Sequence, residues 1–246
     1  AERKRVVEIC SEECGDVMTI ISGVNCENTA ESIEMAKEAK EAGADGILLM
    51  PPHMWLRFGM HKDAPFEYVK DVAEKGAAAV IVEKDVEVPE GLTVIKVEDT
   101  RYALALMSAA YFGYPAEKLK TIGITGTKGK TTTTYMVKAI LEEVGHKVGL
   151  IGTIEAIIGD KTIPSNNTTP ESYTIQKYFA QMVEAGCDCV VMEVSSQGLM
   201  LHRTAGIMFD IGIFTNLGED HIGPNEHKDF EDYKHCKGLL FKQCKV

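Results

Sequence analysis

The sequence predicts an α/β fold in which helices cover both faces of a mainly parallel sheet. Apolar runs of strand length alternate with longer stretches whose apolar residues recur at helical spacing. Such alternation is typical of βα units, because parallel strands need a helix or another long crossover between them. Hydrophobic residues make up 45% of the 246 positions, enough to form the core that such a sheet requires.

Four strands and three helices are predicted in the first half of the chain. Asn28 is a candidate N-cap for the first helix, and Gly43 is placed to end it. In chain order, the predicted elements are a strand at 17–24, a helix at 28–43, a strand at 46–50, a helix at 64–77, strands at 78–83 and 92–97, and a helix at 100–113.

The second half continues the alternation, starting with a strand that runs into a glycine-rich loop. Because parallel strands place their carboxyl ends at one edge of a sheet, the loops that follow these strands are expected to meet. The predicted elements are a strand at 121–125, helices at 131–144 and 171–185, and strands at 147–154, 189–195 and 209–216.

Charge and hydropathy exclude several classes of protein. The net charge of -11 and the pI of about 5.2 disfavour a nucleic-acid or anionic-membrane surface. No apolar run approaches the length of a membrane-spanning helix, and the first ten residues lack the apolar core of a signal peptide. We therefore expect a cytoplasmic protein with no nucleic-acid or membrane partner.

The seven cysteines lack C-x-x-C spacing, which predicts free thiols in a reducing compartment. Cys187 and Cys189 flank a single aspartate inside an apolar stretch. A metal site is one interpretation of this pair, but the end of a strand fits the apolar flanks better. We assign no zinc to it.

The loop "TGTKGKTTTT" predicts a phosphate-binding site. Gly126 and Gly129 allow the backbone to approach an anion closely, and the helix that follows directs its N–H groups and positive dipole end at the loop. Lys130 supplies a cation, and Thr131 offers a hydroxyl to magnesium. The spacing departs from the strict P-loop pattern, because Ile124 stands where that pattern has its first glycine.

Six stretches give the chain a family resemblance. They are "GITGTKGKTTT", "LIGTI", "NNTTPES", "VVMEVSSQGL", "FDIGIFTNLGEDH" and "YKHCKGLLF". In order and spacing they resemble the Mur ligase family, and within it the UDP-N-acetylmuramoyl-tripeptide synthetases, from about residue 75 to residue 246. This family shares the displaced first glycine. The resemblance implies an ATP-dependent ligase that joins an amino acid to UDP-N-acetylmuramoyl-dipeptide in peptidoglycan synthesis, with ATP and Mg²⁺ as cofactors.

The resemblance also implies roles for individual residues. Thr131 and Glu193 would hold one magnesium ion, and His221 a second. Glu193 lies at the end of one predicted strand and His221 just beyond another. Lys130, His221 and Lys237 would be the catalytic residues. The implied nucleotide-binding residues are Gly126, Thr127, Lys128, Gly129, Lys130, Thr131 and Thr132.

Lys237 matches the family's lysine that reacts with carbon dioxide to form a carbamate. A carbamate replaces a cation with carboxylate-like oxygens, which suits a second magnesium ion beside His221. From spacing alone, a solvated surface lysine is the simpler interpretation. The motif "YKHCKGLLF" around it favours the carbamate.

The resemblance assigns five residues to the muramoyl substrate: Asn167, Thr168, Thr169, Ser195 and Arg203. Amide, hydroxyl and guanidinium groups are suitable partners for a sugar and a carboxylate. For the threonine pair, an ordinary turn before Pro170 is the alternative. We expect His202 and His227 to be surface histidines.

Residues 1–74 resemble a different family, that of dihydrodipicolinate synthase and N-acetylneuraminate lyase, through "ISGVNCENTAESIEMAKEAKEAGADGILLMPP". Members of that family are (β/α)₈ barrels, and this stretch covers about two of their βα units. Its Schiff-base lysine would lie on a later strand that does not follow here, and Met54 stands near the position of its catalytic tyrosine. We expect this fragment to be catalytically empty.

Three parts are therefore predicted: an aldolase-like fragment at 1–74, a remnant of a Mur ligase N-terminal domain at 75–117, and a partial central ATP-binding domain at 118–246. An incomplete sheet exposes an edge and apolar surface, which favours self-association. Besides an incomplete ligase, two alternatives remain: a dihydrodipicolinate synthase-type lyase, which the missing lysine disfavours, and a non-catalytic nucleotide-binding protein.

Overall fold

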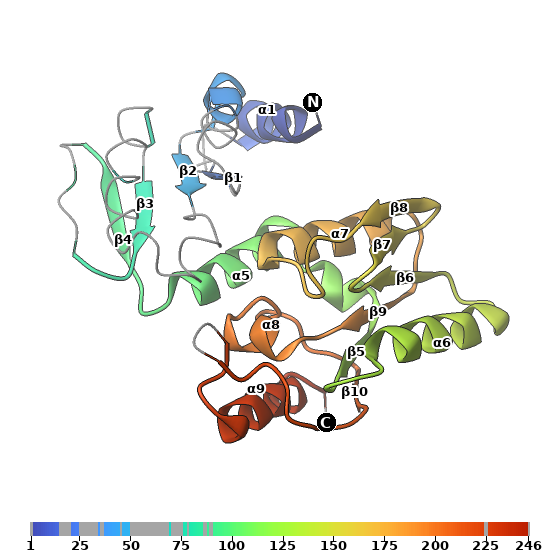
Figure 1. Ribbon diagram of the computed structural model, residues 1–246. Coiled ribbons are helices and arrows are strands. Elements are labelled where there is room, and N and C mark those ends of the chain that lie inside the picture. Colours follow the sequence, from blue (N-terminus) through green and yellow to red (C-terminus); the bar gives the residue numbers. More distant parts are fainter. Residues whose placement is uncertain are drawn as a thin grey trace. The chain divides into compact units, whose positions relative to one another are not determined.

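The computed structural model describes residues 2–14, 21–24, 34, 37–44, 46–49, 69, 76–77, 79–85, 88, 91–223 and 226–245 (Figure 1). The chain folds as two compact units, Ala1–Thr100 and Arg101–Val246. The division at residues 74 and 117 remains a prediction.

The first unit contains two pairs of parallel strands. In the first pair Ile21 lies opposite Gly46, and in the second Ala79 lies opposite Thr93. These strands fall within the runs predicted for them. Their bounds are β1 (Ile21–Val24), β2 (Gly46–Leu49), β3 (Ala79–Val82) and β4 (Thr93–Lys96).

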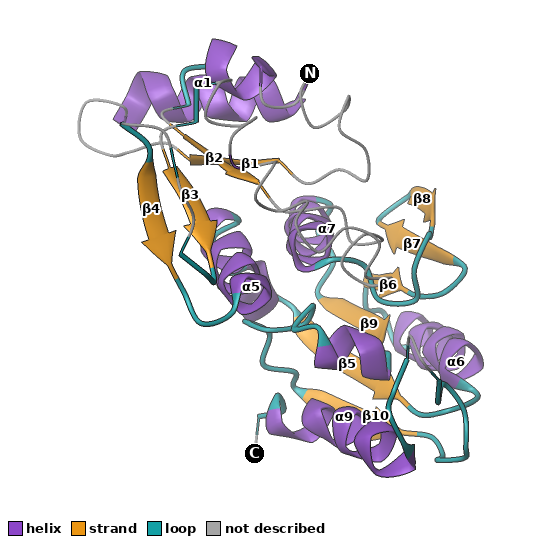
Figure 2. Ribbon diagram, turned by 60° about the vertical axis from the view of Figure 1, so that its left-hand side comes forward, coloured by secondary structure: helices purple, strands orange, loops and turns teal. Residues whose placement is uncertain are grey.

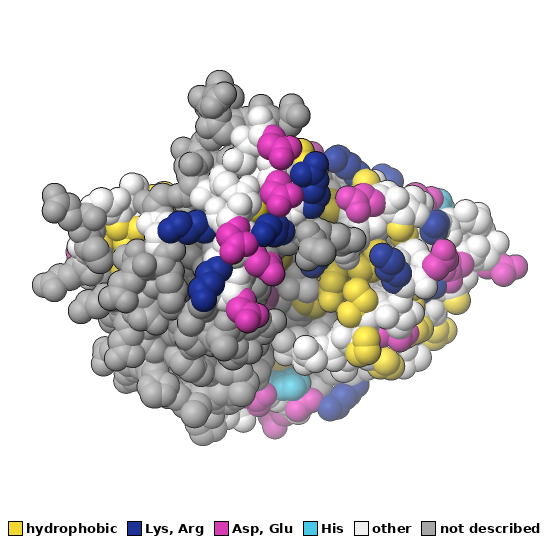
Figure 3. Space-filling model, turned by 90° about the horizontal axis from the view of Figure 1, so that it is seen from above, with side chains coloured by type: hydrophobic (Ala, Val, Ile, Leu, Met, Phe, Trp, Pro, Cys, Tyr) yellow, Lys and Arg dark blue, Asp and Glu magenta, His cyan; other side chains and the backbone are white. Residues whose placement is uncertain are grey.

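A helix that the sequence did not predict opens the first unit, α1 (Glu2–Cys14). Val7 is its buried apolar residue, and most of its remaining described side chains are polar, so the apolar periodicity is weak. Figure 3 shows acidic and basic side chains interspersed on the face that it presents. Among the residues of the first unit, Lys4 of α1 pairs with Glu41 at 2.8 Å and Arg5 with Glu8 at 3.2 Å.

Two predicted helices of this unit are described only in part. Residues 34 and 37–41 of the predicted helix at 28–43 are helical, and so is Val69 of the one at 64–77. Residues 42–43 and 76–77, at the ends of these predictions, are described and are not helical. The other positions of both helices lie outside the described residues, as does Met54.

A six-stranded sheet forms the second unit, with the strand order β10-β5-β9-β6-β7-β8. The first four strands are parallel, as predicted, whereas β7 and β8 are antiparallel. The predicted strand at 147–154 is too long, because the chain reverses after Ile151 into the unpredicted β7–β8 hairpin. The strands are β5 (Lys120–Thr125), β6 (Val148–Ile151), β7 (Glu155–Ile158), β8 (Lys161–Pro164), β9 (Cys189–Glu193) and β10 (Ile211–Phe214).

Helices cover both faces of this sheet, which confirms the predicted fold class (Figure 2). On one face, Val137 and Leu141 of α6 pack against the core that contains Ile124. On the other, Phe179 of α7 and Leu240 of α9 belong to a second core. The helices are α5 (Thr100–Tyr111), α6 (Lys130–Glu143), α7 (Ser172–Glu184), α8 (Ser196–Met200) and α9 (Phe230–Lys242), with a short 3₁₀ helix at Pro115–Lys118.

Among the described residues, no helix has both the length and the apolar character that a membrane-spanning helix needs. Cys10, Cys187, Cys189, Cys236 and Cys244 are free thiols, as predicted.

Candidate functional site

The glycine-rich loop lies between the end of β5 and the start of α6, as the sequence predicted. Gly126 has φ 145° and Gly129 has φ 81°, conformations that L side chains rarely adopt. Gly129 is the N-cap of α6, and no side chain of the described chain caps this helix. The first-turn N–H groups of any helix lack intrahelical acceptors. Since no side chain among the described residues caps them here, they are available to bind an anion.

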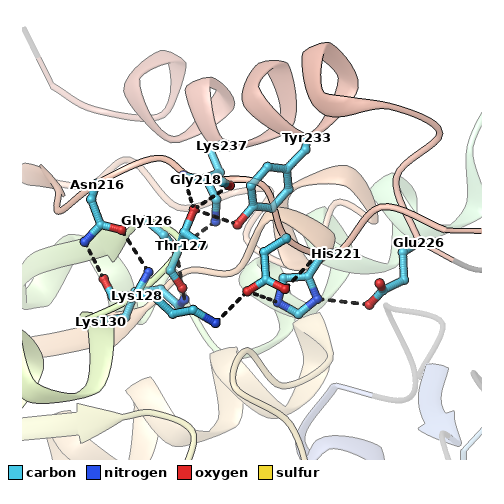
Figure 4. Close-up of polar contacts among 11 residues, drawn as sticks. Gly126, Thr127, Lys128, Lys130, Asn216, Gly218, His221, Glu226, Tyr233 and Lys237 are labelled. Atoms are coloured by element: carbon cyan, nitrogen blue, oxygen red, sulfur yellow. Dashed lines mark hydrogen bonds and ion pairs between the residues drawn. The ribbon is translucent and has the colours of Figure 1, made fainter.

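Asn216, just beyond β10, holds the loop in this conformation (Figure 4). Its side-chain amide donates to the Lys128 carbonyl and accepts from the Lys128 N–H, both at 3.0 Å. Its main-chain carbonyl accepts from the Thr127 N–H at 2.9 Å. The Thr127 hydroxyl in turn accepts from Gly218 N–H and from the Tyr233 hydroxyl, both at 3.0 Å. The loop is thus ordered by its neighbours as well as by its glycines.

Two lysine ammonium groups converge on one carbonyl of the loop. Nζ of Lys130 and Nζ of Lys237 each donate to the carbonyl oxygen of Gly126 at 2.8 Å. Burial lowers the pKa of Lys130. Burial, and then the charge of Lys130, lower the pKa of Lys237 to about 7. An anionic group such as a phosphate would relieve the electrostatic repulsion between the two lysine side chains.

Lys237 is a buried side chain of α9, only 2% exposed. Its Nζ lies 4.4 Å from the centre of the Tyr233 ring, close enough for a cation–π contact. The interpretation of Lys237 as a solvated surface lysine is therefore wrong.

Thr131 and Glu193 form a second polar centre, between the first turn of α6 and the end of β9. The Thr131 hydroxyl donates to Glu193 Oε2 at 3.0 Å, and the N–H and hydroxyl of Thr153 donate to the same carboxylate at 2.9 and 3.1 Å. Glu193 is 1% exposed, and no basic side chain in the described ranges forms an ion pair with it. Hydroxyl and carboxylate oxygens are suitable ligands for magnesium.

His221 lies beyond β10, on the Tyr233 side of the loop. Its Nδ1 is 2.9 Å from Glu226 Oε1, and its ring centre is 6.1 Å from that of Tyr233. Because Lys237 lies over the same tyrosine ring, the structure brings His221 and Lys237 to one place (Figure 4). His221 has φ 55°, a left-handed conformation that is uncommon for a non-glycine residue.

Two further loop residues differ in their surroundings. Lys128 is exposed, and its Nζ pairs with Asp220 Oδ2 at 2.7 Å. Thr132 is exposed in the first turn of α6.

Three of the residues assigned to the substrate are bonded to the protein itself. The Thr169 hydroxyl donates to the Glu193 carbonyl at 3.0 Å and accepts from the Ser195 N–H at 2.9 Å. The Ser195 hydroxyl caps α8 by accepting from the Gly198 N–H at 3.0 Å. Arg203, 4% exposed, donates to the Thr169 carbonyl at 2.9 Å.

The other two substrate candidates lie nearer the surface. Asn167 is exposed, and the Thr168 hydroxyl lies 3.0 Å from that of Thr153, which connects it to the Glu193 centre. The stretch "NNTTPES" thus runs from the exposed Asn167 to the buried Thr169, which contacts the end of β9 at Glu193.

The prediction of a surface position was wrong for His227, which is fully buried. Its Nδ1 lies 3.1 Å from Asp232 Oδ2 and its Nε2 2.9 Å from the Ser196 hydroxyl, because the loop before α9 packs against the start of α8. His202 is partly buried, with its ring edge-on to Tyr102 at 5.5 Å between centres.

Sequence reasoning assigned no role to Thr153, Asn216, Asp220 or Tyr233. All four lie inside stretches that carried the resemblance, "LIGTI", "FTNLGEDH" and "YKHCKGLLF". Asp220 next to His221 was the available signal, because an acid–histidine pair in the loop that follows a parallel strand is a common feature of polar sites.

Two family models match this chain. The model described as "Mur ligase middle domain" matches residues 124–246. The model described as "Dihydrodipicolinate synthetase family" matches residues 1–90.

Curated relatives match the larger part of the chain. A Clostridium perfringens protein named "UDP-N-acetylmuramoyl-L-alanyl-D-glutamate--2,6-diaminopimelate ligase" is 52% identical over 176 residues, which are 72% of this chain and 36% of that protein. A Caldanaerobacter subterraneus protein of the same name is 45% identical over 195 residues, 79% of this chain and 40% of that protein. The chain therefore spans 36 to 40% of the length of these two relatives.

A solved structure shares the fold. It carries the same ligase name, and it superposes with a TM-score of 0.68 at 23% identity, over 83% of this chain and 39% of the other. The family model covers half of the chain, including every residue of the loop and the site residues Glu193, His221, Tyr233 and Lys237. This chain belongs to the Mur ligase family, through that family's middle domain.

Proposed function

We propose that the second unit binds the phosphates of Mg²⁺-ATP, as part of a ligase that joins an amino acid to UDP-N-acetylmuramoyl-dipeptide in peptidoglycan synthesis. The observation that supports this most directly is the convergence of Lys130 and Lys237 on Gly126 O, each at 2.8 Å, beside the uncapped start of α6. The names of the relatives support the reaction and favour 2,6-diaminopimelate as the amino acid.

The loop residues would bind the nucleotide through main-chain and side-chain donors. The N–H groups of the first turn, from Gly129 to Thr132, carry the positive end of the helix dipole. Lys130 would exchange its bonds to loop carbonyls for bonds to phosphate oxygens. Thr127, held by Gly218 and Tyr233, and Lys128, held by Asn216, would keep the loop open for this exchange.

The site fits two magnesium ions. Thr131 and Glu193 offer adjacent oxygens, and Glu193 is buried without an ion-pair partner among the described residues. His221 and the carbamate of Lys237 would hold the second ion. When bound, ATP and magnesium supply a phosphoryl group that activates the substrate carboxylate and the charge that screens its oxygens.

Carbamate formation requires a neutral amine at Lys237. With a pKa of about 7, much of this amine is unprotonated near neutral pH. Its nitrogen lone pair adds to the carbon of carbon dioxide and releases a proton to solvent, which leaves a carbamate anion. The positive charge of Lys130 disfavours a charged amine at Lys237, and it attracts the carbamate anion instead.

Substrate contacts are proposed in two groups. Asn167 and Thr168 lie at or near the surface and would contact the muramoyl substrate directly. Thr169, Ser195 and Arg203 are bonded to the protein, and we infer that they shape this region around Glu193. We also propose a cytoplasmic location and keep the three-part division at residues 74 and 117.

A nucleotide titration tests the proposal. Mg²⁺-ATP is titrated into the full chain and into the Lys130→Ala and Lys138→Ala variants. Lys138 lies on the same helix, where it pairs with Glu142, so its loss controls for a general change of charge. We expect at least a ~10-fold weaker affinity in Lys130→Ala and no change in Lys138→Ala. Equal affinities in all three proteins would refute the proposal.

A further inference from the structure

We propose that His227, Asp232 and Cys236 form a site for a zinc-class divalent ion, separate from the nucleotide loop. One ligand atom from each of these residues lies within 4.8 Å of the other two. Asp232 and Cys236 are one helical turn apart on α9, and His227 comes from the loop that precedes this helix. Imidazole nitrogen, thiolate sulfur and carboxylate oxygen are the ligand types that zinc prefers.

The imidazole of His227 is oriented as metal-binding histidines commonly are. Its Nε2 is 2.9 Å from the Ser196 hydroxyl, and its Nδ1 faces Asp232 Oδ2 at 3.1 Å. With no ion bound, Nδ1–H donates to the Asp232 carboxylate. When a metal replaces that hydrogen on Nδ1, Nε2 carries the remaining hydrogen and donates it to the serine oxygen. A hydrogen bond to the second ring nitrogen fixes the tautomer and the ring orientation of a ligating histidine.

Charge balance suits this buried position. His227 is fully buried and Cys236 is 4% exposed, so an unbalanced charge here would be costly. Binding of the ion displaces the thiol proton to solvent, and one thiolate with one carboxylate then neutralises a divalent cation. The Asp232 side chain is 25% exposed and gives the ion a route from solvent.

Only small side-chain shifts are needed for coordination. In tetrahedral zinc sites with ligand bonds of about 2.0 to 2.3 Å, ligand atoms lie about 3.3 to 3.8 Å apart. The 3.1 Å between His227 and Asp232 is already near this range, and the 4.8 Å limit on the other separations is within reach of a rotation about the Cys236 side chain.

A second group of the same ligand types provides a control. His146, Asp188 and Cys189 also lie within 4.8 Å of one another, but His146 and Asp188 are exposed. Among the described contacts, His146 bonds Asp188 alone, so its ring lacks the support that Ser196 gives to His227. Cys189→Ala removes the thiol of this group and leaves the proposed site unchanged.

Cobalt titration of the full chain tests the proposal. The chain is freed of metal with a chelator and titrated with Co²⁺, whose thiolate charge-transfer and tetrahedral d–d absorption bands report the ligand set, and zinc is then added in competition. We expect one ion per chain with both bands. The apparent affinity should fall at least ~10-fold in Cys236→Ala and in His227→Gln, and should be unchanged in Cys189→Ala.

The proposal would be overturned by no stoichiometric binding to the unmodified chain, by cobalt bands without a thiolate contribution, or by loss of the bands in Cys189→Ala but not in Cys236→Ala. Asp232→Asn tests the site without a change at a fully buried position. The Asp232 side chain is partly exposed, and asparagine has nearly the same volume, so this variant should fold even if the variants at buried positions do not. Retention of full affinity in a folded Asp232→Asn protein, judged by circular dichroism, would remove Asp232 from the site and refute the three-ligand proposal.

Discussion

The hydroxyl of Thr131 lies 3.0 Å from Oε2 of Glu193 and joins the start of α6 to the end of β9. These residues are 62 positions apart in the sequence. They meet because β5 and β9 are adjacent parallel strands whose carboxyl ends share one edge of the sheet. A hydroxyl of the phosphate loop and a buried carboxylate are thus positioned to bind the same cation.

Glu193→Gln should remove the magnesium dependence of nucleotide binding. The amide keeps the size of the side chain but loses the negative charge that attracts the ion. We expect ATP affinity in the presence of Mg²⁺ to fall at least ~10-fold, and affinity in the presence of a chelator to change little. Calorimetric titration under both conditions measures this, with the exposed Glu184→Gln as the control. Unaltered enhancement by Mg²⁺ in Glu193→Gln would argue against a metal at this carboxylate.

Lys237→Met should stabilise the chain at low pH more than at high pH. The pKa of Lys237 is about 7 in the folded chain, against 10.5 for an ordinary lysine. Between these values the unfolded chain holds the proton and the folded chain does not, so the stability of the unmodified chain rises with pH. The advantage of Lys237→Met should therefore be greatest at pH 7 and below, and should shrink by up to about 1.4 kcal/mol per pH unit above it.

Urea unfolding in CO₂-free buffer at pH 6.5 and pH 9 measures the effect. Lys234→Met, an exposed position on the same helix, is the control and should show no comparable trend. An advantage of Lys237→Met that stays constant between these pH values would mean that Lys237 titrates normally.

The parallel part of the sheet could be predicted from sequence because each strand is a short, mainly apolar run. β9 is buried at all five positions, as expected for a central parallel strand, and such runs leave little ambiguity. The β7–β8 hairpin was missed because it follows β6 after only three residues, 152–154, so the apolar pattern continues across the turn. Helix α1 was missed for the opposite reason, since Val7 is its main buried apolar residue.

Site residues were predictable where chemistry and position agree, as for Lys130 and Thr131 after the last loop glycine. The partners of these residues were not predictable, because they come from other strands. The Asn216 side chain forms two hydrogen bonds with the main chain of Lys128, 88 residues away. The burial of His227 likewise depends on the packing of α8 against the loop before α9, which no local pattern encodes.

Arg203→Met should destabilise the fold strongly. The guanidinium is 4% exposed and pairs with Glu171 at 2.8 Å, while it also donates to the Thr169 carbonyl. Removal of the cation leaves a largely buried carboxylate with less compensation, which typically costs about 3–5 kcal/mol. Chemical denaturation measures the loss, and Lys234→Ala, which breaks an exposed pair with Glu231, should change stability by less than about 1 kcal/mol.

A loss below about 1 kcal/mol in Arg203→Met would instead indicate that this arginine is retained for binding. Nucleotide and substrate affinities would then have to fall without a change in the midpoint of unfolding.

Gly126→Ala and Gly129→Ala should differ in severity although both glycines have positive φ. At Gly129 an added Cβ meets no atom within 4 Å, so the cost is backbone strain alone, about 1–2 kcal/mol. At Gly126 the Cβ would collide with the Thr215 hydroxyl and would lie 3.1 Å from the main-chain nitrogen of Asn216. Gly126→Ala should therefore lose more stability and also displace Asn216 from Lys128.

Comparison of the two alanine variants separates strain from collision. If collision contributes, Thr215→Ala should recover part of the stability lost in Gly126→Ala but none of that lost in Gly129→Ala, because only Gly126 faces Thr215. Denaturation of the single and double variants gives the coupling between the two positions. Equal losses in both glycine variants, with no rescue by Thr215→Ala, would show that backbone strain alone makes glycine necessary in this loop.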